Sequence, residues 1–184
     1  MPNTKPVGVA FSDPELVAGT TITGATISGG TITGSTISST AKVASNIASG
    51  ISASQQGATI ATTTAGTNDV FMIAPAAGVL TSALFSGVDA LTANDTNYIT
   101  FSITNLGQAG AGTAAMLAAT DANTTKATGG TGIAANTVRS LTLNGTAANL
   151  VVASGDRIRI RATVSGTLAN TVTFPVYRLN FTVS

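Results

Sequence analysis

The stretch NYITFSITNL (residues 97–106) alternates apolar and polar side chains along almost its whole length. Its apolar positions are Ile99, Phe101 and Ile103, and Tyr98, Thr100, Ser102 and Thr104 lie between them. A period of two places the apolar side chains on one face of an extended strand and the polar side chains on the other. The stretch therefore predicts a half-buried β-strand of an antiparallel sheet.

A similar strand-like pattern extends from about residue 68 to the end of the chain. Short apolar runs alternate with turn residues, at a spacing typical of a β-sandwich. The expected strands are 70–73, 78–88, 97–106, 137–143, 150–152, 157–164 and 171–183, and the clearest turns are Asn94-Asp95, Gly129-Gly130, Asn144-Gly145 and Ser154-Gly155-Asp156. We expect residues 67–184 to form an antiparallel, jelly-roll-like β-sandwich that folds alone from about residue 65.

Finer features of this region follow from the same pattern. Leu80, Leu84 and Val88 are expected on one face of their strand. Residues 114–119 could form one helical turn, and residues 120–135 are expected to form a long loop on an outer surface.

A different pattern precedes the sandwich, in TTITGATISGGTITGSTISS (residues 20–39). Ile22, Ile27, Ile32 and Ile37 recur every five residues, and Gly24, Gly29 and Gly34 follow the same step. This period fits neither a helix nor a pleated strand, and indicates a chain that turns after each short extended piece. Four units cannot bury their own Ile row. We therefore expect residues 20–40 to form a three-fold β-prism from three copies; the alternative is a Thr/Ser/Gly linker with accidental regularity.

The flanking segments are poor in core-forming patterns. Residues 1–19 contain Pro at three positions and read as an extended arm that is ordered on a partner. Its expected contact residues are Val7, Val9, Phe11 and Pro14. Residues 41–66 are low in complexity and predict a linker or neck. Val43, Ile47 and Ile51 are spaced by four, so a short helix is the alternative to a flexible neck.

Composition favours a subunit of an assembly. Charged residues are 8% of the chain, against a usual share of about 25%. Such a charge-poor surface is a solubility liability for a free monomer. The net charge of +1 implies no bulk attraction to nucleic acid or to a membrane. No apolar run approaches the ~20 residues of a membrane span, and no secretory leader is expected.

The chain offers little catalytic chemistry. It has neither His nor Cys, which excludes Ser-His and Cys-His nucleophiles and any His or thiolate metal ligand. A glycosidase pair could be drawn from Asp89, Asp95 and Asp121, although nothing in their spacing favours it. The stretch 121–125 resembles a calcium loop only weakly and is better read as a polar surface loop. We expect no catalytic residue, no cofactor and no metal site.

One charge pattern stands out, in RIRIR (residues 157–161). On a strand, Arg157, Arg159 and Arg161 project from one face while Ile158 and Ile160 enter the core. The row is read first as a solvated strand face. The alternative is an interface that pairs with acidic groups, because a guanidinium forms forked hydrogen bonds to carboxylates.

These segments together resemble virion structural proteins of tailed bacteriophages. The opening Gly8-Val9-Ala10-Phe11-Ser12-Asp13-Pro14, followed by Thr-Ile-Thr-Gly repeats, resembles the attachment region of head-fibre, decoration and tail-fibre proteins. The stretch from Val70 to Ser184 is similar to the small β-sandwich of decoration (cement) proteins, through the segments 73–78, 91–98 and 154–157. The family has no catalytic residues to carry over.

The resemblance implies a homotrimer that binds the major capsid protein on the capsid exterior and stabilises the head. Residues 1–19 would then be the capsid-binding arm. The alternative is a tail-fibre or receptor-binding tip protein that recognises a host glycan or protein. A carbohydrate-active enzyme on a β-sandwich is the weakest of the three hypotheses.

Overall fold

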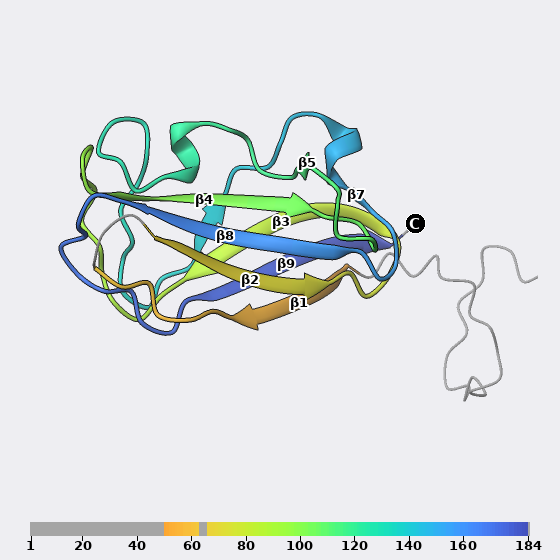
Figure 1. Cartoon of the computed structure of the whole chain (residues 1–184), viewed down its shortest axis with the longest axis horizontal. Coiled ribbons are helices and arrows are strands. Elements are labelled where there is room, and N and C mark those ends of the chain that lie inside the picture. Colours follow the sequence, from red (N-terminus) through yellow and green to blue (C-terminus); the bar gives the residue numbers. More distant parts are fainter. Residues whose placement is uncertain (1–49, 63–65, 184) are drawn as a thin grey trace, which may run out of the picture. The chain divides into compact units, whose positions relative to one another are not determined.

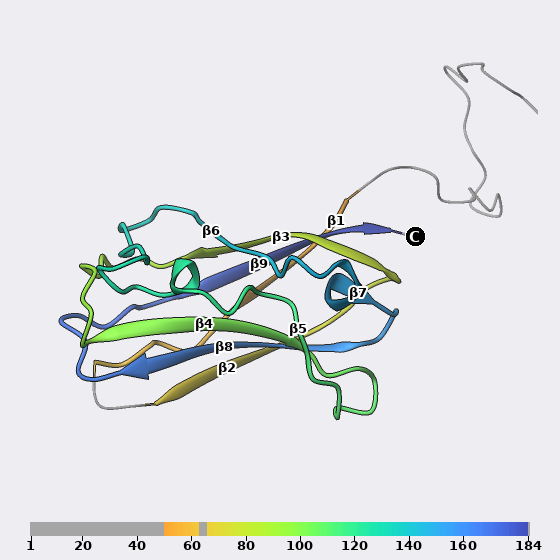
Figure 2. The ribbon, with the colours of Figure 1, turned by 90° about the horizontal axis from the view of Figure 1, so that it is seen from above.

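The computed structural model describes residues 50–62 and 66–183, and in this part the chain is all-β. Two antiparallel sheets lie face to face as two layers (Figures 1 and 2). The first sheet has the order β1 (Ile51–Gln56), β9 (Val176–Val183), β3 (Gly78–Ser86) and β6 (Arg139–Leu141), with β7 (Val151–Val152) also paired to β3; the second has the order β2 (Thr67–Ile73), β8 (Arg157–Ser165), β4 (Tyr98–Asn105) and β5 (Ala114–Ala115). Two short 3-10 turns, η1 (Asp121–Asn123) and η2 (Ala147–Leu150), lie in the connections. The predicted all-β class is confirmed, and the two layers are consistent with a β-sandwich.

Alternating side chains from both sheets form the core between the layers. Ile99, Phe101 and Ile103 of β4 are each at most 2% exposed, as the alternation predicted. From the other layer, the Phe85 ring contacts Phe101 across the core at a centroid distance of 4.7 Å, and Tyr177 at 5.3 Å. Burial raises the pKa of the Tyr177 hydroxyl. The aromatic cluster therefore links β3 and β9 to β4.

Strand β3 contains a β-bulge that the sequence pattern does not predict. Leu80 pairs with Phe181 of β9, but the next pair is Ser82 with Asn180, so Thr81 is an extra residue. A bulge of one residue reverses which side chains face inward after it. Ala83 and Phe85 therefore enter the core, and the prediction that Leu80, Leu84 and Val88 share a face is wrong.

Strand β3 begins at a glycine because no side chain fits there. A Cβ on Gly78 would lie 2.0 Å from the carbonyl oxygen of Thr182 on β9. Glycine thus lets β3 approach its neighbour at the point where β7 also joins it.

Strand β1 lies in the stretch 41–66 that the sequence assigned to a linker or neck. Its residues pair with β9 from Ile51 opposite Phe181 to Gln56 opposite Val176, so the alternative of a helix extending to Ile51 is wrong. Further on, Ile60 is fully buried and exchanges two backbone hydrogen bonds of 3.0 Å with Val172. Within the described residues, the sandwich therefore already includes residue 51.

The arm at residues 1–19 and the repeat at residues 20–40 lie outside the described residues, as do residues 41–49 of the predicted neck. The expected helical turn at residues 114–119 is not formed: Ala114 and Ala115 are the two residues of β5, paired with Asn105 and Thr104 of β4.

Candidate functional site

The chain segment after β5 behaves as an interrupted edge strand of the second sheet. The amide of Met116 donates to the carbonyl of Ile103 at 2.8 Å, and the amide of Thr125 donates to the carbonyl of Ile99 at 2.8 Å. Between these two contacts the chain leaves β4 and passes through η1. Alternate residues of a strand direct their backbone groups to the same edge. The C=O of Phe101, midway between Ile99 and Ile103, therefore faces the gap, while the bridge between Thr100 and Thr124 directs its N–H toward the carbonyl of Asn123.

This gap opens into a groove with a cavity volume of about 330 Å³. Hydroxyl-bearing residues of β4 line one side, namely Tyr98, Thr100, Ser102 and Thr104. Small and apolar residues line the other side, namely Leu117, Ala118 and Ala119, with Thr120 beyond them. The groove thus combines an apolar wall with a row of hydroxyls.

A buried amide holds the wall in place. Asn123 is 1% exposed, and its side chain donates to the carbonyls of Ala118 and Thr142 at 2.8 Å each. Its carbonyl oxygen accepts from the amide of Thr142 at 2.7 Å. Thr125 is also buried, and its hydroxyl oxygen accepts from the amide of Ile99 at 2.8 Å. The sequence described 121–125 as a polar surface loop, yet these two polar side chains point inward.

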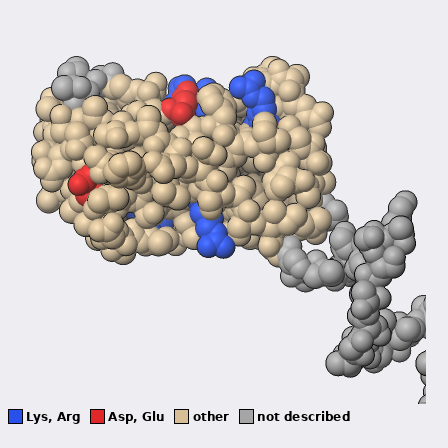
Figure 3. All heavy atoms as spheres, turned by 90° about the horizontal axis from the view of Figure 1, so that it is seen from below, with Lys and Arg blue, Asp and Glu red and all other residues tan. Residues whose placement is uncertain are grey.

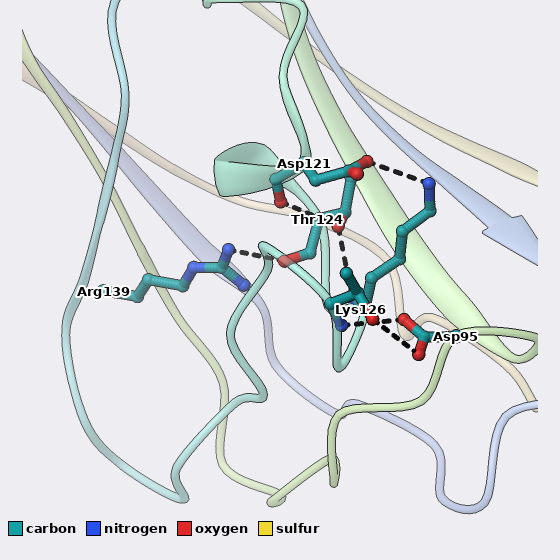
Figure 4. Close-up of polar contacts among 6 residues, drawn as sticks. Asp95, Asp121, Thr124, Lys126 and Arg139 are labelled. Atoms are coloured by element: carbon teal, nitrogen blue, oxygen red, sulfur yellow. Dashed lines mark hydrogen bonds and ion pairs between the residues drawn. The ribbon is translucent and has the colours of Figure 1, made fainter.

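Charged side chains fix the end of the groove (Figure 4). Lys126 donates to the carboxylate of Asp121 at 2.9 Å, and its ammonium lies 5.0 Å from the centre of the Tyr98 ring. The hydrogen bond to Asp121 raises the pKa of Lys126. The guanidinium of Arg139 donates to the carbonyl of Thr124 at 2.7 Å, and it also donates to the carbonyl of Ala122 at 2.8 Å. The loop is thus tied to β6 as well as to β4.

The three candidate glycosidase acids have other partners. Asp95 accepts from the amide and hydroxyl of Thr128, and Asp89 accepts from the amide and hydroxyl of Thr173. These donated hydrogen bonds lower the pKa of both carboxyls. A general acid at neutral pH needs a raised pKa. Asp89 and Asp95 therefore fit the role of loop anchors, and Asp121 pairs with Lys126.

The Arg row lies on the outer face of the second sheet, and Ile158 and Ile160 are buried beneath it as predicted. Arg161 forms a forked pair with Asp69 of β2, with both nitrogen–oxygen distances at 2.6 Å. Arg161 thereby lowers the pKa of Asp69, first through the hydrogen bond and further through its charge. Acidic pairing thus occurs at this arginine, within the chain's own sheet.

The other two arginines have no such partner among the described residues. The guanidinium of Arg157 lies 5.1 Å from the centre of the Phe71 ring, a cation–π contact. The Nε of Arg159 is buried without a hydrogen-bond partner in the part of the chain that the structure describes. The exposed side chains of Phe71 and Ile73, on neighbouring β2, make this a mixed basic and apolar face.

The remaining predicted site residues lie outside the described residues, namely Ile22, Ile27, Ile32 and Ile37 of the repeat and Val7, Val9, Phe11 and Pro14 of the arm. Over residues 50–62 and 66–183, acidic side chains do not gather in groups of three or more that could hold a metal ion. In the same ranges, no helix has the length and hydrophobicity to cross a bilayer. Comparison with protein-family models, curated proteins and solved structures finds no match to this chain.

Proposed function

We propose that the protein is a virion structural protein of a tailed bacteriophage, which decorates and stabilises the capsid as a homotrimer. The observation that carries this proposal is the five-residue Ile row of residues 22–37, whose four units need other copies to bury it. The surface of the described part supports it. Charged side chains are few on the face shown in Figure 3, as suits a subunit that works within an assembly.

Stabilisation of the shell would follow from binding alone. A protein that contacts the assembled capsid and not its separated subunits shifts the equilibrium toward the assembled state by mass action. Three arms on one trimer would add avidity, because each bound arm raises the local concentration of the others. The major capsid protein is the proposed partner, and the arm residues Val7, Val9, Phe11 and Pro14 are its proposed contacts.

A tail-fibre or receptor-binding tip protein is the second candidate. The groove beside β4 is the specific observation that favours it, because a receptor-binding protein needs a formed recess for its ligand.

The trimer is tested at the Ile row. Changing Ile27 and Ile32 to Asp should give monomers, since carboxylates on a closed three-fold axis are costly to bury. Changing Thr26 and Thr31 to Asp is the matched control, because these positions precede the Ile residues in the same repeat units and should leave the trimer intact. Light scattering measures the mass in each case. A wild-type protein that is monomeric at micromolar concentration contradicts the proposal.

Head binding is tested by removing the arm. Deletion of residues 2–18 should abolish sedimentation with emptied, tailless heads while the trimer persists in light scattering. The full chain should bind these heads and raise the temperature at which they break open. This temperature is measured by the entry of a dye into the head interior during heating. Binding to isolated tails or host cells without binding to heads would replace the decoration proposal with the fibre-tip alternative.

A further inference from the structure

We propose that the groove beside β4 is a binding site for a neutral saccharide. This site would add a recognition function to a capsid-decorating protein, and it does not depend on the proposed trimer. Its volume of about 330 Å³ is at the lower end of the range for small-molecule sites, which suits one or two sugar rings.

The backbone of Phe101 sets the chemistry of the ligand. Its C=O faces the groove between the two points where the neighbouring segment pairs with β4, at Met116 and Thr125. A ligand that fills the gap must offer a hydrogen-bond donor to this carbonyl, because an unpaired buried peptide group is unfavourable. A sugar hydroxyl can donate to the carbonyl of Phe101 and at the same time accept from a neighbouring hydroxyl of β4.

The two walls of the groove match the polar edges and the apolar C–H face of a sugar ring. The hydroxyl-bearing side of Thr100, Ser102 and Thr104 supplies groups that donate and accept, as the edges of a sugar ring require. The opposite wall of Leu117, Ala118 and Ala119 offers apolar contact for the C–H face of the ring. Asp121 and Lys126 add one acceptor and one donor at the end of the groove.

Other ligand classes fit less well. An extended peptide would need several free ladder positions, but β4 is paired on this edge at Thr104 with Ala115 and at Thr100 with Thr124, which leaves only residues 101–103 between them. An anion would have to compete with Asp121 for Lys126, and a cation with Lys126 for Asp121. A purely apolar ligand would leave the carbonyl of Phe101 unsatisfied.

The site is formed before any ligand arrives. Asn123 fixes the wall by three hydrogen bonds, and Arg139 clamps the carbonyls of Ala122 and Thr124. A rigid recess avoids the entropy loss of ordering a loop on binding. This rigidity favours measurable affinity for a ligand as small as a disaccharide.

Two variants of the full chain separate this site from the rest of the surface. Ala119→Phe places a ring in the groove at an exposed position, so the fold should tolerate it. Ala122→Phe is the matched control, because Ala122 is exposed three residues further on, in η1, but does not line the groove. Near-equal melting temperatures of the two variants and the wild type establish that each is folded.

The probes are methyl glycosides of glucose, galactose, mannose and N-acetylglucosamine, with their common disaccharides, screened by saturation-transfer NMR and on a glycan array. We expect at least one neutral saccharide to bind saturably, with a Kd of about 1 mM for a monosaccharide. Binding should also shift the amide resonance of Phe101. Affinity should fall at least about tenfold in Ala119→Phe and stay unchanged in Ala122→Phe. Absence of binding across the panel, equal binding by both variants, or preferential binding of inorganic phosphate or an extended peptide would overturn the proposal.

Discussion

A fragment of residues 66–184 is expected to lose cooperative unfolding, whereas a fragment of residues 50–184 should unfold in one sharp transition. The shorter fragment lacks β1, whose six residues pair with β9, and it lacks the fully buried Ile60. Loss of a buried Ile side chain alone costs about 2–5 kcal/mol, and the exposed edge of β9 adds to this. A domain of this size has a total stability of about 5–15 kcal/mol, so the deletion removes a large share of it.

Circular dichroism during heating measures both transitions. Ile60→Ala in the longer fragment is the control, because it removes the core contact while β1 stays in place. Its melting temperature should lie below that of the unchanged fragment, with the transition still sharp. If residues 66–184 melted at the same temperature as residues 50–184, β1 would be an addition to the sandwich rather than part of its stability.

The second large effect is expected at Asn123. Replacing it with Ala leaves the carbonyl of Ala118 and the amide of Thr142 without their partner, while the carbonyl of Thr142 still accepts from the amide of Ala118 at 3.0 Å. Each unsatisfied group in this part-buried setting costs about 1–3 kcal/mol, and we expect a total loss of about 2–4 kcal/mol because the effects do not add fully. Urea unfolding at equilibrium measures the difference.

Asn144 provides the matched comparison. Its side chain also bonds two backbone groups, the carbonyl of Ala115 and the amide of Thr146, but in an exposed setting where water can replace it. Asn144→Ala should therefore cost about 1 kcal/mol or less. Equal losses at the two positions would show that the burial of Asn123 is not what makes its hydrogen bonds important.

Strands with a local pattern of apolar and polar residues could be predicted from the sequence, whereas strands that depend on pairing with a distant segment could not. The strands β4 and β8 carry their signal locally, because Ile99, Phe101 and Ile103, like Ile158 and Ile160, alternate with polar residues. Strand β1 (ISASQQ) has little apolar content, since only Ile51 and Ala53 are even partly buried, and it is a strand because β9 offers it an edge. Its existence depends on partners 120 to 130 positions away along the chain, from Gln56 opposite Val176 to Ile51 opposite Phe181, which no local pattern records.

The groove was missed for the same kind of reason. It exists because one segment pairs with β4 at two separated points, at Ala115 and at Thr124, and leaves it in between. The bulge at Thr81 is likewise a property of the pairing with β9 rather than of a distinctive residue. A partial signal was present in the polar residues Asn123 and Thr125, but their inward orientation depends on the carbonyls and amides that other segments bring to them.

The adjacency of Ile51 and Phe181 gives the sandwich a direction of mechanical weakness. The backbone hydrogen bonds of antiparallel strands lie perpendicular to the strands. Tension between residue 50 and the C-terminal end of β9 would therefore peel the β1–β9 ladder one pair at a time, beginning at Ile51. Tension between residue 50 and the opposite end of the sandwich, near Ile60 and Val172, would instead shear all six pairs of this ladder together. A tether through residue 50 should thus hold firmly against drag on the far loops, and yield readily to a pull on the C-terminus.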